Sequence, residues 1–306
     1  MGILVIGATF VDIKGFPFDN YLPTGRNAGR VEYVHGGVAR NVVEDIANVE
    51  LRPTFLSIVD DTPMGDAVVK KLQNHKVNTD YVLTRPDGMG TWLAVFDNNG
   101  DVAGSISKRP NMYPVAELLE EKGDEIFSQV PSVVLEVGLD KEIIKGTLSL
   151  AQKHKVKTFA LVANMSIAAE RRDLLQQFDC VICNQQEAGI LFLDDYDNVT
   201  PEQMRDILAD RIVAANIPSM VVTMGAEGAV YASLQGEKGL CPARKVQVKD
   251  TTGAGDSFCA GVAIGMTYGK TLAESVEIGT TLAASVITSS ENVCPRFRPE
   301  EFGLSV

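Results

Sequence analysis

Apolar runs that alternate with helical patterns constrain the fold of this chain most strongly. The runs contain few polar side chains, which is typical of strands buried on both faces of a sheet. They lie at residues 3–10, 54–59, 132–137, 157–162, 179–183 and 219–224. Helical patterns such as 36–49 and 64–75 lie between them. This alternation predicts an α/β fold with a doubly wound, mostly parallel sheet and helices on both faces.

Two stretches do not fit this alternation of strands and helices, and they predict a second, smaller sheet. Residues 13–35 are polar and rich in Gly and Pro, and residues 90–106 have strand-like flanks around an Asn-Gly turn signal. A small sheet of this kind, projecting from the main domain, would act as a lid over a ligand. The expected division is a lid of residues 13–36 and 89–106 on a core of residues 1–12, 37–88 and 107–306.

Charge and composition exclude several classes of function for this chain of 306 residues. Its net charge of −12 argues against a nucleic-acid-binding surface, which requires a basic face. The apolar opening reaches only to Asp12, which is too short to span a bilayer. Cys180 and Cys183 form a CxxC without a second pair, so buried thiols are favoured over a zinc site. We therefore expect a cytoplasmic enzyme with neither nucleic acid nor a membrane among its partners.

The stretch "DTTGAGDSFCAG" combines a glycine turn, an acid and an apolar helical run. A helix that begins at Gly253, Ala254 and Gly255 presents unpaired amides at its tip, which is a favourable site for an anion. Small residues there let a phosphate approach the backbone. Asp256 would repel a resting phosphate, so we interpret it as a base that takes a proton from an attacking hydroxyl. The structural alternative is an N-capping aspartate after a flexible turn.

Two further motifs complete the candidate site. In "GGVARN", a second glycine turn of Gly36 and Gly37 opens the helix that carries Asn41, and Asp12 is expected nearby at the end of the first strand. Their acceptors and donors suit a ligand with vicinal hydroxyls. In "NQQE", Asn184 and Glu187 follow a buried strand at a spacing that suits hydrated Mg²⁺ or, alternatively, a simple helix capping box.

These motifs, in this order, resemble those of the ribokinase-like (PfkB) family of carbohydrate kinases. "DTTGAGDSFCAGV" resembles the C-terminal signature of the family, "GGVARN" its N-terminal glycine-pair segment, "NQQE" its N-x-x-E motif and "TMGAEGAV" (223–230) its nucleotide-side turn. The resemblance covers nearly the whole chain. It implies a ribokinase-like fold with a β-sheet lid and ATP-dependent phosphorylation of a sugar-like hydroxymethyl group.

The resemblance also assigns roles to individual residues. Asp256 would be the catalytic base and the amides of Gly253, Ala254 and Gly255 the anion hole. The sugar hydroxyls would be held by Asp12, Gly36, Gly37 and Asn41. The nucleotide side would comprise Asn184, Glu187, Thr223, Gly225, Gly228 and Asn292, the last beside the adenine. Glu187 would act on Mg²⁺ through water, and a monovalent cation, K⁺, would lie near Asp250. In this family the lid sheet often mediates a homodimer.

Within the family, the segment 29–49 is most similar to pseudouridine kinases, which would make the acceptor a C-nucleoside and the product pseudouridine 5′-phosphate. Phe10 departs from the usual Asn at its position, and Lys108 with Arg109 would suit a phosphorylated acceptor. A hexose or pentose kinase, such as a fructokinase, ribokinase or phosphosugar kinase, therefore stays open. A non-catalytic sugar-binding regulator is a rival from another class, but the chain retains Asp256. A Rossmann dehydrogenase would require a G-x-G-x-x-G after the first strand, where this chain has none.

Overall fold

The computed structural model describes residues 2–98, 100–162, 169–170 and 172–305. Within these residues, nine strands form one large sheet, in the order β13-β12-β11-β10-β9-β8-β1-β4-β5. The strands from β5 to β11 in that order are mutually parallel, and β12 and β13 add an antiparallel edge. Their bounds are β1 Leu4–Ile6, β4 Thr54–Val59, β5 Asn78–Thr84, β8 Ser132–Glu136, β9 Lys157–Leu161, β10 Cys180–Asn184, β11 Ser219–Thr223, β12 Ala229–Ser233 and β13 Lys238–Cys241.

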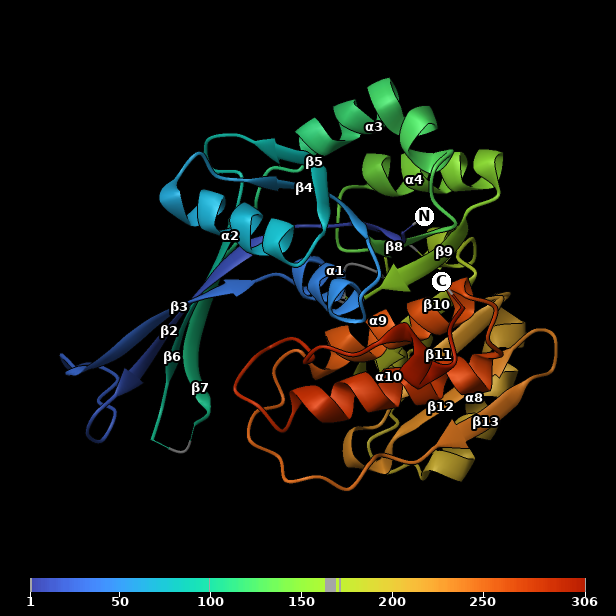
Figure 1. The fold of residues 1–306 in the computed structure, drawn as a ribbon. Helices are drawn as coiled ribbons and strands as arrows, with labels where there is room; N and C mark the ends of the chain where they lie inside the picture. Colours follow the sequence, from blue (N-terminus) through green and yellow to red (C-terminus); the bar gives the residue numbers. More distant parts are fainter. Residues whose placement is uncertain (1, 99, 163–168, 171, 306) are drawn as a thin grey trace.

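Helices cover both faces of this sheet (Figure 1). One face packs against α1 (Val38–Asn48), α2 (Pro63–Asn74), α9 (Ala254–Thr267) and α10 (Leu272–Val286). The other packs against α3 (Tyr113–Phe127), α4 (Lys141–His154), α6 (Arg172–Leu175), α7 (Gln185–Phe192) and α8 (Pro201–Ala215). Short 3₁₀ turns lie at η1 (Gly225–Glu227) and η2 (Pro299–Phe302). The expected doubly wound α/β fold is confirmed.

Strand β1 shows why the apolar runs are continuous rather than alternating. Its side chains point alternately into two different cores, Leu4 and Ile6 into one and Val5 into the other, and all three are completely buried. A strand sandwiched between two helical layers has no solvent face on which a polar residue would be favoured. Helix α2 is capped by Thr62, whose side chain accepts a hydrogen bond from the amide of Gly65 at 3.3 Å. Among the described residues, no helix is long and apolar enough to cross a membrane.

A separate four-stranded sheet projects from the body as a lid (Figure 1). Its order is β3-β2-β6-β7, with β2 Phe10–Pro17, β3 Gly29–Gly36, β6 Gly90–Phe96 and β7 Val102–Lys108. Strands β6 and β7 form the hairpin that the Asn-Gly signal indicated. The inward row of side chains across this sheet includes Asp12, Trp92 and Ser107, which are paired in register and line one cavity.

One expectation about the first strand was wrong. Asp12 does not lie at the end of a core strand that runs from residue 3 to residue 10, because β1 ends at Ile6 and β2 of the lid begins at Phe10. The chain leaves the core at Gly7, where any Cβ would collide with Ala39 and with the carboxylate of Glu136. From Phe10 onward the backbone pairs with β3 and β6 instead. Asp12 is therefore carried by the lid.

Candidate active site

The candidate site is a cavity of about 570 Å³ between the lid and the carboxyl ends of β1 and β8. Strand β1 is the point where the sheet order reverses, since the chain builds outward to β4 and β5 and then returns to β8 on the other side. Ligands of open α/β sheets bind in the crevice at such a switch point. The expected residues Asp12, Gly37, Asn41 and Asp256 all line this cavity.

Asp256 lies in the first turn of α9, whose N-cap is Gly253. One carboxylate oxygen of Asp256 accepts a hydrogen bond from the side-chain amide of Asn41, at 2.6 Å. Burial raises the pKa of Asp256 to about 7, opposed by the Asn41 bond and by Arg40 and reinforced by the carboxylates of Glu136 and Asp12. A carboxylate with a pKa near neutral is well matched to general-base work at physiological pH.

The two glycines before Asp256 have different structural requirements. Gly253 has φ +82°, and a Cβ there would collide with the backbone carbonyl of Asn292. A Cβ on Gly255 would meet nothing within 4 Å. Gly253 is therefore required by the fold, whereas the space above Gly255 is open for a ligand. Together with Ala254, these residues form the amide-bearing tip of α9.

At Gly36 and Gly37 the fold requires residues without a side chain. The carboxylate of Asp12 lies directly over Gly36, where any side chain would displace it. Gly37 has φ +99° and is the N-cap of α1, the helix that carries Asn41. Burial raises the pKa of Asp12, although Lys14 and Arg40 oppose this rise.

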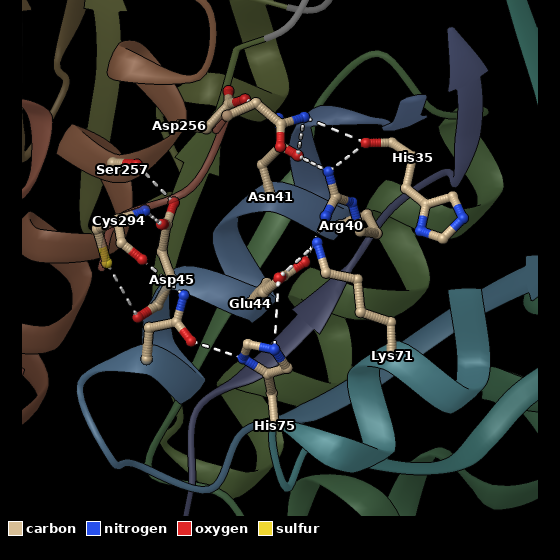
Figure 2. Close-up of polar contacts among 12 residues, drawn as sticks. His35, Arg40, Asn41, Glu44, Asp45, Lys71, His75, Asp256, Ser257 and Cys294 are labelled. Atoms are coloured by element: carbon tan, nitrogen blue, oxygen red, sulfur yellow. Dashed lines mark hydrogen bonds and ion pairs between the residues drawn. The ribbon is translucent and has the colours of Figure 1, made fainter. Parts of the chain in front are cut away.

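Helix α1 is joined to the start of α9 by a second buried carboxylate. Asp45 accepts a hydrogen bond from the Ser257 hydroxyl at 2.7 Å and another from the Cys294 amide at 2.6 Å (Figure 2). Burial raises the pKa of Asp45 to about 7. One turn earlier on α1, Asn41 meets Asp256. The two contacts fix the register between α1, which bears Asn41, and α9, which bears Asp256.

The sequence interpretation missed several residues of the cavity lining, including Glu136, Trp92 and Asp140. Glu136, at the end of β8, accepts a hydrogen bond from the Ala8 amide at 2.9 Å, and burial raises its pKa. The signal for it was an acid at the carboxyl end of an otherwise apolar strand. Trp92 of the lid and Asp140 at the start of α4 also line the cavity. Trp92 is the single tryptophan of the chain, but its inward direction depends on the lid register.

The two basic residues that end the lid hairpin, Lys108 and Arg109, point in different directions. Lys108 points away from the cavity and forms an ion pair with Asp87 at 2.8 Å. Arg109 lines the cavity and donates a hydrogen bond to the Gly138 carbonyl at 3.1 Å. Of these two residues, only Arg109 therefore faces the cavity.

Five of the expected nucleotide residues, Asn184, Glu187, Thr223, Gly225 and Gly228, lie farther along the same edge of the sheet, and none of them lines the cavity. Asn184 and Thr223 are direct neighbours across β10 and β11. Asn184 and Glu187 form a capping box, with both hydrogen bonds at 2.8 Å, so the structural alternative for this pair is present. The glycines of the next turn, Gly225 and Gly228, both have positive φ.

The remaining two predicted residues have defined partners. Asn292 donates to the His35 carbonyl at 3.1 Å and to the Asn41 side-chain oxygen at 3.2 Å, which places its amide beside Asn41 rather than along the edge of β10 and β11. Its position beside an adenine stays a prediction. Asp250 accepts a hydrogen bond from the Thr252 amide at 2.8 Å. In the described ranges, no group of three or more His, Cys, Asp or Glu side chains is arranged to hold a metal ion.

Comparisons with known proteins identify the family of this chain. The family model "pfkB family carbohydrate kinase" matches residues 2–294. The chain is 35% identical to a guanosine-inosine kinase of Exiguobacterium acetylicum over 95% of each chain, and 25% identical to a pseudouridine kinase of Escherichia coli over 90% of this chain and 86% of that one.

A solved structure shows the same fold. The ribokinase of Arabidopsis thaliana, complexed with ribose and ATP, superposes with a TM-score of 0.82 at 19% identity and covers 96% of both chains. We conclude that the chain belongs to the PfkB family of carbohydrate kinases and is a phosphotransferase that acts on an alcohol group.

Proposed function

We propose that this protein is an ATP-dependent nucleoside kinase that phosphorylates the 5′-hydroxyl of guanosine or inosine. The observation that carries the proposal is the meeting of Asp256, Asn41 and Asp12 in one cavity at the tip of α9. A hydroxymethyl group at Asp256 would leave the ribose hydroxyls within reach of Asp12 and Asn41. The relative of 35% identity, matched over 95% of its length, is a guanosine-inosine kinase, which favours a nucleoside over a free sugar.

In the proposed mechanism, Asp256 accepts the proton of the 5′-hydroxyl as that oxygen forms its bond to the terminal phosphorus of ATP. The bond from this phosphorus to the bridging oxygen breaks, and ADP leaves with the electron pair. The amides at the tip of α9 and the helix dipole stabilise the negative charge on the transferring group. We assign the nucleotide to the edge formed by Asn184, Thr223, Gly225 and Gly228.

The proposal includes two metal ions, Mg²⁺ with the nucleotide and a monovalent cation near Asp250. Mg²⁺ bound to the triphosphate would offset its charge, and Glu187 is the residue that would hold it, through water. Asp250, which orders the turn before Gly253, is assigned to a monovalent cation such as K⁺. ATP use and five free thiols support a cytoplasmic location.

The lining of the cavity supports a 6-oxopurine as the base of the acceptor. We place the ribose between Asp12 and Asp256 and the base against the rest of the lining, which includes Arg109, Asp140, Phe10 and Trp92. An arginine fork matches the O6 and N7 acceptors that guanine and hypoxanthine share. The carboxylate of Asp140 does not cap α4 and can accept from the N1–H of the same base. Pseudouridine is the second candidate, because its kinase is also a relative and its base has two carbonyl groups for Arg109.

The acceptor is tested by ADP release with guanosine, inosine, adenosine, pseudouridine, uridine, ribose, fructose and fructose 6-phosphate. We expect the highest kcat/KM with guanosine and inosine. Arg109→Ala should lower that value roughly tenfold or more, since it removes a bidentate contact. Lys108→Ala is the matched control and should leave it unchanged, because Lys108 pairs with Asp87 outside the cavity. Turnover of ribose or fructose but of no nucleoside would overturn the proposed acceptor.

We also propose that the outer face of the lid forms a homodimer. The outward row of the lid sheet places Tyr33, Ile13, Leu93 and Ile106 side by side in register. Tyr33 is 62% exposed and Ile106 is 70% exposed. Neighbouring exposed apolar side chains on one sheet face are typical of an interaction surface.

Sedimentation velocity at micromolar concentration tests this dimer. The wild-type protein should sediment as a dimer and Ile106→Asp as a monomer, because a charge would be buried without a partner. Val213→Asp is the control, since Val213 is similarly exposed but lies on α8 of the core. A monomeric wild-type protein would contradict the proposed interface.

A further inference from the structure

Arg40, on α1, is buried beside the catalytic carboxylate in spite of its charge. Its side chain and that of Glu44, one turn later, are each only 1% exposed, and the two form an ion pair. Glu44 is contacted from the outside by Lys71 at 2.9 Å. A charge buried to this extent lowers the stability of the fold unless it is paired. The ion pair with Glu44 is therefore needed to hold Arg40 at this position.

The second branch of the Arg40 guanidinium reaches the active site. One of its nitrogens donates both to the carbonyl of His35, at the end of lid strand β3, and to the side-chain oxygen of Asn41 (Figure 2). The same Asn41 oxygen accepts from Asn292 at 3.2 Å. Arginine offers only donors, so two donors converge on this atom and it must be the oxygen of the amide.

The orientation of the Asn41 amide decides whether a hydrogen-bond donor or an acceptor faces the Asp256 carboxylate. With its oxygen held by Arg40 and Asn292, the amide has only its nitrogen left to face Asp256, and it donates to the carboxylate at 2.6 Å. A hydrogen bond donated to a carboxylate favours the ionised form. The reversed amide would instead place an oxygen against the carboxylate and would favour the protonated form, which cannot act as a base.

We propose that Arg40 is a positioning residue for catalysis: by holding the Asn41 oxygen, it turns the Asn41 nitrogen toward Asp256 and keeps that carboxylate able to accept a proton. The inference rests on the proposed role of Asp256 as the base. It assigns to Arg40 a function beyond folding, and it connects the base to the root of lid strand β3 through the His35 carbonyl.

Other titratable groups also lie near Asp256 and interact with it electrostatically. Those that influence its pKa or whose own pKa it influences are Arg40 and Asp45 on α1, Asp12 on β2, Glu136 on β8 and Cys259 on α9. Arg40 is the cation among them, and it also opposes the raised pKa of Asp12. Removing Arg40 therefore takes away both the amide orientation and the positive charge that favour ionised Asp256.

The test measures the titration of Asp256 directly, without turnover. The side-chain carboxyl carbons of aspartate are labelled with ¹³C, the Asp256 signal is assigned by its loss in Asp256→Asn, and its midpoint is followed with pH. Arg40→Met leaves Glu44 buried without its main partner and risks misfolding, so the decisive variant is Arg40→Met/Glu44→Met, which replaces the whole pair with apolar side chains. We expect the Asp256 midpoint to rise by about one pH unit or more in this variant.

Lys71→Met is the matched control. It removes a positive charge from the same cluster but leaves the contacts of Arg40 with Asn41 and His35 in place, so the midpoint should stay at the wild-type value. An unchanged midpoint in a folded Arg40→Met/Glu44→Met protein would overturn the inference and leave Arg40 a structural residue. Because the measurement needs no acceptor, it can succeed even if guanosine and inosine prove not to be substrates.

Discussion

Asp256→Asn is expected to lower kcat about 10²–10⁴-fold while nucleotide and nucleoside still bind. Asparagine has nearly the shape of aspartate and can keep a contact with Asn41, so the cavity should be preserved. It cannot accept the proton of the attacking hydroxyl at neutral pH. The effect is measured by ADP release for kcat and by calorimetry for the binding of guanosine and ATP.

Asp124→Asn provides the control for this substitution. Asp124 is an exposed aspartate of α3 that pairs with Lys153 and His154, far in the fold from the cavity lining. Turnover should be normal in that variant. Near-normal turnover in Asp256→Asn would remove the assignment of the base, whereas loss of binding without loss of kcat would make Asp256 a ligand-holding residue only.

Gly255→Ala should lower turnover by about an order of magnitude or more while leaving the protein at least as stable. Alanine in the first turn of α9 meets no atom within 4 Å and is a better helix former than glycine by roughly 0.5–1 kcal/mol. The added methyl group would, however, occupy the open space through which a phosphate approaches the amides. Thermal unfolding and ADP release, measured on the same sample, separate the two effects.

Gly253→Ala provides the contrast. A methyl group there collides with the Asn292 carbonyl, and the positive φ of the residue disfavours any side chain, so both stability and turnover should fall. A Gly255→Ala protein that is stable and fully active would show that no phosphate approaches the tip of α9.

The layers of the fold followed from the sequence because burial on both faces imposes apolar runs on each core strand. The lid was also predictable, since polar segments cannot occupy a sheet covered by helices. The place of Asp12 was not, because three residues, Gly7 to Thr9, separate the core strand from the lid strand. An apolar run conceals such a break when the next strand starts with Phe10.

The candidate site was predictable where a motif brings neighbours together, as at Gly253 and Asp256. Contacts across the chain were not. Glu136 meets the site only because β8 lies beside β1, and Asn41 meets Asp256 and Asn292 only because α1 packs against the start of α9. Local spacing does not show which of the many acids and arginines will be buried beside a catalytic carboxylate.

A crystal structure with a non-hydrolysable ATP analogue, Mg²⁺ and guanosine would locate the reacting groups directly. We expect the terminal phosphate within hydrogen-bonding distance of the amides that follow Gly253, and the 5′-hydroxyl of guanosine against the Asp256 carboxylate. A terminal phosphate bound away from the tip of α9, with Asp256 out of reach of any hydroxyl, would contradict the proposed chemistry.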